Sequence, residues 1–324
     1  MIDELRNSAK KILKEVKYII GYEKGSNSFS ARPFFITNEK DIESLIFSPL
    51  CSQNLAKYIK KEKDGKIGIV AKGCDTRAII QLIQEKIISR DDIYVIGIVC
   101  NGVIDKIKLE QEWWKRNSDL KSAFGFDIIE DKELYKISYN GMEIKIEREK
   151  LIAEECMSCR YPVPLLYDVL IEQPKLLSIS EPKRKIENME VEERKKYWLE
   201  EFDKCIRCYA CRSICPLCYC KECSADPIEL AIKPDTTPIA KATNPIWLSK
   251  SVNSKNNLFF QLVRIFHTTG RCVSCVSCSF ACPVGIELNL LTRKMVEEVK
   301  NKLNHEAGMR IDDKPILAFG ELDE

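Results

Sequence analysis

The chain has 324 residues, enough for two domains with separate hydrophobic cores. Its 51 lysines and arginines nearly balance 49 acidic residues, so net charge gives no reason to expect nucleic-acid binding. The longest apolar runs, such as Ile93–Cys100, are far shorter than a membrane span, and the charged N-terminal segment lacks the apolar core of a signal peptide. We therefore expect a cytoplasmic protein with no nucleic-acid partner and no membrane insertion.

The first 61 residues contain one clear helical pattern. Apolar residues at helical spacing predict a helix over residues 1–20. Residues 21–50 are expected to be irregular, with a short strand near Phe34–Ile36. The Ser48-Pro49 turn then precedes a predicted helix from about Gln53 to Lys61.

Residues 66–100 carry the clearest pattern of regular structure. Two short apolar runs, Lys66–Lys72 and Ile93–Cys100, are typical of buried strands. Between them, Arg77–Ile88 has apolar residues at helical spacing. Strand, helix and strand in this order predict a parallel βαβ unit as the core of an α/β domain.

A hairpin is predicted farther along the same domain. Glu133–Tyr139 and Met142–Glu147 flank Asn140-Gly141, and Asn-Gly is the strongest short signal for a two-residue hairpin turn.

The second half of the chain is predicted to be mostly helical. A helix containing Trp198 leads into a cysteine-rich stretch, and further helices are expected over Leu258–Thr268 and about Glu287–Asn304. Residues 224–256, rich in Pro, Thr, Asn and Ser, form a predicted irregular excursion. The expected organisation is an α/β domain over residues 1–177, a polar linker over 178–195, a mostly helical domain over 196–305 and an extended tail over 306–324.

Two copies of one motif, CxxCxxCxxxCP, dominate the helical domain. The cysteines are Cys205, Cys208, Cys211 and Cys215 in the first copy, and Cys272, Cys275, Cys278 and Cys282 in the second. This is the ligand pattern of a two-cluster ferredoxin, in which the fourth cysteine of each copy binds the other cluster. The predicted ligand sets for two 4Fe–4S clusters are Cys205, Cys208 and Cys211 with Cys282, and Cys272, Cys275 and Cys278 with Cys215.

Zinc and disulfides are the alternatives for these thiols. His267 and His305 are the only histidines in the sequence, which argues against Cys/His zinc sites. Disulfides require an oxidising compartment, whereas 16 cysteines in a reducing one indicate metal ligation and an anaerobic host. A protein scaffold with structural zinc stays open as an alternative.

Five further cysteines belong to the α/β domain. Cys74 and Cys100 follow the two predicted parallel strands, at the sheet edge where ligands bind in such folds. Cys156 and Cys159 form a CxxC pair. These four are the first choice for a third iron–sulfur cluster or metal site, with Cys51 as a substitute. Alternatively, Cys51 and Cys100 are ordinary buried apolar residues.

Three more cysteines, Cys218, Cys220 and Cys223, closely follow the first motif. Their density predicts either another metal site or a redox-active thiol patch beside a cluster.

The turn after the first parallel strand is a candidate flavin site. Gly73, Asp75, Thr76 and Arg77 lie where a helix N-terminus would favour the phosphate of FAD. The turn lacks the glycine spacing of a dinucleotide fingerprint, and Arg77 could instead pair with a carboxylate.

Several of these stretches together resemble a known family. They are Val70–Glu85 (VAKGCDTRAIIQLIQE), Val99–Val103 (VCNGV), the Cys156–Cys159 pair, the run Cys205–Cys223 and His267–Asn289. They are similar to the iron–sulfur β-subunits of deazaflavin-dependent hydrogenases and formate dehydrogenases, in particular those associated with heterodisulfide-reductase-type complexes. The resemblance implies a subunit that passes electrons between a catalytic dehydrogenase or hydrogenase subunit and a heterodisulfide-reductase-like redox subunit.

Three functions follow from these patterns. The first is a non-catalytic electron-transfer subunit of an anaerobic oxidoreductase complex, since two histidines leave little scope for histidine-based catalysis. The second is a flavin-containing subunit that exchanges hydride with a deazaflavin or nicotinamide carrier. The third is the zinc-bound scaffold.

Overall fold

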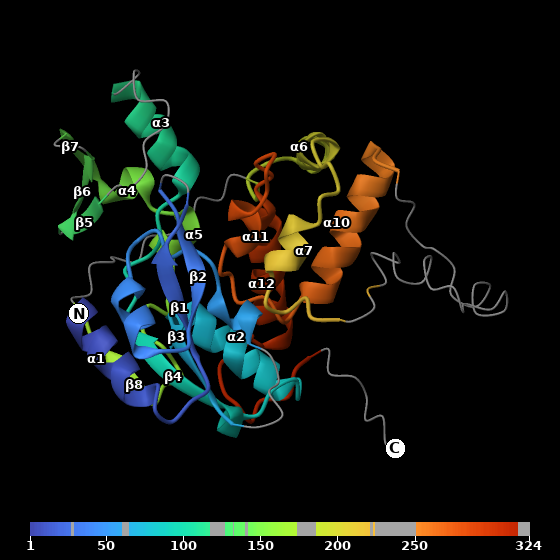
Figure 1. Cartoon of the computed structure of the whole chain (residues 1–324). Helices are drawn as coiled ribbons and strands as arrows, with labels where there is room; N and C mark the ends of the chain where they lie inside the picture. The colour runs from blue at the N-terminus through green and yellow to red at the C-terminus, as the bar shows by residue number, and fades with distance from the viewer. Residues whose placement is uncertain are drawn as a thin grey trace, which may run out of the picture.

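The structure is a computed structural model that describes residues 1–26, 29–59, 65–116, 127–131, 133–139, 142–173, 186–220, 223 and 251–316. A five-stranded sheet with helices on both faces forms one part, and a group of helices lies to one side of it (Figure 1). The predicted mixed α/β fold is confirmed. None of the helices in these ranges is both long and apolar enough to cross a membrane.

The main sheet is largely parallel and has the order β2-β1-β3-β4-β8. Its strands are β1 (Ile19–Lys24), β2 (Ala31–Ile36), β3 (Ile67–Ala71), β4 (Ile93–Ile98) and β8 (Val169–Ile171). Only β2 runs antiparallel to its neighbour. α2 (Gly73–Gln84) connects the parallel pair β3 and β4, which confirms the predicted βαβ unit.

Helices cover both faces of this sheet because successive strand residues point to opposite sides. From β3, Val70 packs in the apolar cluster with α1 (Ile2–Ile12), whereas Ile69 packs in the cluster with α2. Strands buried on both faces read as continuous apolar runs, which is why β3 and β4 could be predicted.

The predicted helix over residues 1–20 is wrong beyond its first half. α1 ends at Ile12, and Ile19 and Ile20 begin β1, where they pair with both β2 and β3. The two isoleucines fit a helical period and a strand equally well, and burial between two neighbouring strands decides the outcome. Within residues 21–50, expected to be irregular apart from a short strand near Phe34–Ile36, that strand is confirmed as the end of β2, whereas β1 was not predicted. The helix expected after Gln53 is a single 3-10 turn, Leu55–Tyr58.

A separate antiparallel sheet carries the predicted hairpin. It contains β5 (Asp127–Asp131), β6 (Leu134–Tyr139) and β7 (Met142–Glu147), and the pairing of β6 with β7 confirms the hairpin. The Asn140-Gly141 turn lies outside the described residues. Tyr135 and Ile146 pack with Trp113 of α3 (Lys106–Arg116) in the core of this unit. Two short helices, α4 (Arg148–Leu151) and α5 (Glu154–Met157), lead back toward the main sheet.

The helical part contains α6 (Val191–Asp203), α7 (Ala210–Ile214), α10 (Ser254–Thr268), α11 (Ser277–Phe280) and α12 (Leu288–Leu303). The helices predicted around both cysteine motifs are therefore confirmed. α6 begins within the expected linker. Residues 178–185 of that linker and residues 224–250 of the expected excursion lie outside the described residues. The apolar core of the helical part is centred on Phe202, Phe260 and Ile286.

The helical part packs directly against the α/β part. Leu217, which follows the first cysteine motif, and Val273, which lies inside the second, belong to the same apolar cluster as Ile69 of β3. At the end of α2, Glu85 accepts two hydrogen bonds of 2.5 Å from the guanidinium of Arg271. The division into domains at residues 178–195 stays a prediction.

Replacing Glu85 by glutamine is expected to lower the free energy of unfolding by about 1.5–3 kcal/mol. Arg271 is only 13% exposed and would keep its charge without a carboxylate partner. Urea unfolding under anaerobic conditions measures the change. As a control, Glu39→Gln removes the exposed pair with Lys10 and is expected to cost less than about 0.5 kcal/mol. Equal effects of the two substitutions would show that the Glu85 contact contributes no special stability.

The C-terminal segment, predicted to be an extended tail, lies against α2 over its described residues. Arg77 donates two hydrogen bonds, of 3.1 and 2.8 Å, to the carbonyl oxygen of Ala307 and forms an ion pair of 3.5 Å with Glu306. Gln84 donates to the carbonyl oxygen of Arg310 at 2.5 Å. These contacts attach residues 306–310 to the α/β part, and residues 317–324 lie outside the described chain.

Candidate metal centres

The two cysteine motifs adopt the same unusual backbone. In the first copy, Arg207 and Tyr209 flank Cys208 with φ values of 55° and 60°. In the second copy, Ser274 and Val276 flank Cys275 with φ values of 54° and 57°. A left-handed conformation is rare for a β-branched residue such as Val276 and costs about 1–3 kcal/mol, so the surrounding structure must impose it.

This backbone suits the binding of an anionic group. Turns that alternate right- and left-handed residues direct successive N–H groups toward one point, and such arrangements occur at iron–sulfur sites. A short helix follows each loop, α7 in the first copy and α11 in the second, and the two helices lie in contact. The repeated motif in the sequence is therefore also a repeat in three dimensions.

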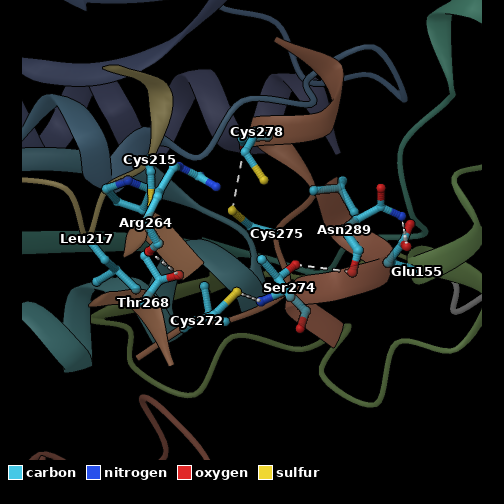
Figure 2. A pocket seen from close by; sticks show the side chains of 15 residues that line it. Glu155, Cys215, Leu217, Arg264, Thr268, Cys272, Ser274, Cys275, Cys278 and Asn289 are labelled. Carbon is cyan, nitrogen blue, oxygen red and sulfur yellow. Dashed lines mark hydrogen bonds between the residues drawn. The ribbon is translucent and has the colours of Figure 1, made fainter. Parts of the chain in front are cut away.

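The structure brings four cysteines of the predicted second ligand set to one cavity. Cys272, Cys275 and Cys278 come from the loop before α11 and from its first turn, and Cys215 comes from the residue after α7 (Figure 2). The backbone N–H of Ser274 donates to the sulfur of Cys272 at 3.4 Å. Hydrogen bonds to sulfur are one of the means by which proteins stabilise ligating thiolates.

Members of the first ligand set gather at the neighbouring core of the helical part. Cys205, Cys211 and Cys282 pack in the apolar cluster around Phe202, and Cys208 is exposed. Gln261 and the backbone N–H of Ile286 each donate a 3.4 Å hydrogen bond to a cysteine sulfur, Cys205 and Cys282 respectively.

The four cysteines predicted as a third set line a second cavity. These are Cys74, Cys100, Cys156 and Cys159. Cys74 lies in the first turn of α2 and Cys100 just beyond β4, so both occupy the carboxyl edge of the parallel sheet. The backbone N–H of Gly102 donates to the sulfur of Cys100 at 3.3 Å. Gly102 has a φ of 91°, and a Cβ there would meet the Cβ of Cys156 at 3.0 Å, so glycine allows these two loops to approach.

The two cavities adjoin. Cys275 lines both of them, together with Ser274, Val276 and Glu155. Cys278, which lines the first of them, also packs against the apolar cluster around Phe202 that contains Cys211. The three groups of thiols are thus arranged in series. We call them the inner set (Cys74, Cys100, Cys156, Cys159), the middle set (Cys215, Cys272, Cys275, Cys278) and the outer set (Cys205, Cys208, Cys211, Cys282).

The remaining four cysteines lie apart from these cavities or at their margins. Cys51 is fully buried and accepts a 3.4 Å hydrogen bond from the backbone N–H of Ser48, as expected of the alternative in which it is a core residue. Cys218 lies beside Cys215. Cys220 is exposed, and Cys223 packs against the core around Phe202.

Burial keeps most of these thiols protonated in the absence of metal. It raises the pKa of Cys100 and Cys272 to about 12 and that of Cys211 and Cys275 to about 11. Since a metal ligand must be a thiolate, metal binding has to release these protons, which couples site assembly to pH. The donor set, sulfur atoms in largely apolar surroundings, fits an iron–sulfur cluster. Across the described residues, no three His, Cys, Asp or Glu side chains converge closely enough to hold a single metal ion.

The predicted phosphate-binding turn is occupied by internal contacts. The carboxylate of Asp75 accepts hydrogen bonds from the backbone N–H groups of Lys72 and Leu55, at 2.9 and 3.2 Å. It also forms a 3.1 Å ion pair with the ammonium group of Lys72, and both side chains are buried. Lys72 donates further to Tyr22 and to the carbonyl oxygen of Gln53. Asp75 therefore caps α2, which begins four residues before the predicted start.

The other three residues of the turn face neighbouring segments of the chain. A Cβ at Gly73 would lie 1.9 Å from the carbonyl oxygen of Tyr161, so the backbones are in close contact there. Thr76 donates to the carbonyl of Gly73 and accepts from the N–H of Leu165. The guanidinium of Arg77 stacks 4.3 Å from the ring of Tyr161 and pairs with a carboxylate, as the alternative anticipated. A bound flavin stays a prediction.

Three charged residues of these cavities were not singled out from the sequence. Lys72 and Glu155 line the inner cavity, and Arg264 and Glu155 line the middle one. The position of Lys72 at the end of a buried strand was a possible signal. Arg264 lies in the second helical turn before the end of α10, and no local pattern distinguishes it from the other charges of the chain.

Comparisons with known proteins identify this α/β protein as a member of a class of oxidoreductase β-subunits. Residues 64–225, half of the chain, match the family described as the C-terminal region of the beta subunit of coenzyme F420 hydrogenase/dehydrogenase. The chain belongs to this family. The F420-dependent formate dehydrogenase subunit beta of Methanocaldococcus jannaschii is 25% identical over 358 residues, covering 91% of this chain and 88% of that protein.

Two further matches are a second curated relative and a solved structure. The F420-dependent formate dehydrogenase 1 subunit beta of Methanococcus maripaludis is 26% identical over 368 residues, covering 93% of this chain and 88% of that protein. Among solved structures, the F420-reducing [NiFe] hydrogenase complex from Methanosarcina barkeri matches 48% of this chain and 56% of its own at 14% identity, with a TM-score of 0.34.

Proposed function

We propose that the protein is the iron–sulfur electron-transfer subunit of a multi-subunit oxidoreductase and relays electrons through three 4Fe–4S clusters held in series. The observation that supports this most strongly is the placement of Cys275 on both the inner and the middle cavity. A relay needs its redox groups close to one another, and a shared wall between two thiol sets provides this closeness. The inner, middle and outer sets are the proposed ligands.

Bound clusters of this kind would supply one-electron transfer at potentials set by the surrounding protein. The residues of this chain contribute the thiolates and the N–H donors that face Cys100, Cys205, Cys272 and Cys282. They also limit access of water, because Val103, Ala153 and Val276 form an apolar cluster, and Val276 lines both cavities. Hydrogen bonding and burial are two of the factors that determine cluster potential.

The names of the relatives suggest one partner, and the exposure of Cys208 suggests where a partner receives or donates electrons. The relatives are β-subunits of formate dehydrogenases, so we propose a catalytic dehydrogenase or hydrogenase subunit as one partner. A heterodisulfide-reductase-like redox subunit is the proposed second partner. Cys208 of the outer set is exposed, which makes that end of the series the proposed point of electron exchange with a partner. In this proposal, residues 1–177 hold the inner set and residues 196–305 hold the other two.

Metal and sulfide analysis of protein purified anaerobically tests the proposal. Three cubane clusters require about twelve irons and as much acid-labile sulfide per chain. About eight irons would restrict the clusters to the ferredoxin-type pair. Zinc without sulfide would favour the scaffold and overturn the proposal, and flavin released on denaturation would favour the hydride-transferring alternative.

A further inference from the structure

We propose that Arg264 is a positioning residue shared by the middle and outer clusters. Its guanidinium donates hydrogen bonds to the sulfur atoms bound in the middle cavity, and its positive charge raises the reduction potentials of both clusters. This inference rests on the proposed function and assigns a specific role to a residue outside the cysteine motifs.

The first observation is that Arg264 is buried with two donors unused. Its side chain is 4% exposed, and one terminal nitrogen donates to the carbonyl oxygen of Cys211 at 3.1 Å. Its Nε and Nη1 groups have no hydrogen-bond partner within the described part of the chain. Leaving charged donors unpaired in a protein interior is costly, so an acceptor is expected beside them.

The second observation is where this side chain lies. Arg264 lines the middle cavity, and Figure 2 shows it next to Cys215 at the wall of that cavity. The carboxylate in the same cavity, Glu155, accepts a hydrogen bond from Asn289 and lies 3.9 Å from Arg293. Sulfur atoms bound by the middle set would supply acceptors for the N–H groups of Arg264 that have no partner among the described residues.

The third observation is that Arg264 stands between two thiol sets. It donates to the carbonyl oxygen of Cys211, a member of the outer set, and it lines the middle cavity together with Cys215 and Cys278. A guanidinium stays protonated in proteins. One fixed positive charge thus acts on two neighbouring redox sites.

A positive charge stabilises the reduced form of a cluster, because reduction adds a negative charge. Removing the charge should lower the reduction potential. Since the same guanidinium acts on both clusters, their potentials should shift in the same direction. The difference between the two potentials then changes less than either potential alone. The inner set lines the other cavity, which Arg264 does not line, so its potential should be little affected.

Redox titration of the complete holoprotein, followed by EPR, tests this inference. In Arg264→Gln, the ratio of reduced to oxidised middle cluster should fall at least tenfold at the wild-type midpoint, which corresponds to about 59 mV for one electron. The outer signal should shift the same way by less. Arg264→Lys keeps the charge but lacks the planar fork, so it should shift the middle signal less than glutamine does.

Arg90→Gln is the matched control. Arg90 donates to the carbonyl oxygen of Ile93 and to Asp168 at the opposite end of β4 from the thiols, so its loss should leave all midpoints unchanged. Full iron content with unchanged midpoints in Arg264→Gln would overturn the inference. If the glutamine variant fails to load iron, Arg264→Met takes its place, because it also removes the charge: a lowered middle midpoint would support the inference, and unchanged midpoints would overturn it. Wild-type protein without iron would instead overturn the proposed function.

Discussion

Replacing Cys275 by alanine is expected to remove about four of about twelve irons per chain and to abolish electron transfer between the inner and outer sets. Cys275 lines both cavities and is therefore the thiol whose loss interrupts the series at its centre. The inner and outer sets keep all of their own cysteines, so their EPR signals should persist while the middle signal disappears. Iron analysis, EPR and the rate of electron transfer through the subunit measure the three effects.

Cys51→Ala is the matched control for this substitution. It removes a thiol that is at least as buried, yet Cys51 lies in the apolar core and not on either cavity wall. We expect it to retain all iron and to transfer electrons normally. Full iron content in Cys275→Ala would contradict the assignment of the middle set, and iron loss in Cys51→Ala would instead favour Cys51 as a ligand of the third cluster.

Replacing Asp75 by asparagine is expected to lower the free energy of unfolding by about 3–5 kcal/mol, because it leaves a buried ammonium group without its counter-charge. Lys72 is 2% exposed and Asp75 is fully buried. Asparagine keeps the size of the side chain and one acceptor for the helix cap, so the substitution mainly removes charge. Urea unfolding under anaerobic conditions measures the loss.

The double variant Lys72→Met, Asp75→Asn separates charge from packing. Replacing both members of a buried ion pair by groups of similar volume is often neutral or stabilising. The double variant should therefore recover most of the stability lost in Asp75→Asn. A loss below about 1 kcal/mol in the single variant would show that Lys72 is neutral or that water reaches it, contrary to the contacts described here.

Local patterns predicted the parts of the fold that depend on local interactions. The buried strands β3 and β4 were predicted correctly, because burial on both faces produces continuous apolar runs. The β6–β7 hairpin was predicted correctly because Asn-Gly is a strong turn signal. Ile19 and Ile20 were assigned to a helix, since their spacing suits one. Their pairing partners in β2 and β3 lie farther along the chain, and that pairing is a tertiary interaction.

The sequence by itself determined the two cysteine motifs, their predicted exchange of a fourth ligand and the family resemblance, because motif spacing is a local property of the chain. Only the tertiary structure decided that Cys74, Cys100, Cys156 and Cys159 share one cavity, since they come from a helix start, a strand end and a short helix. It also decided that Cys275 joins that cavity to the next, and that Arg264 of α10 reaches the thiols of both motifs. Such contacts depend on how distant segments pack, and spacing along the chain does not encode them.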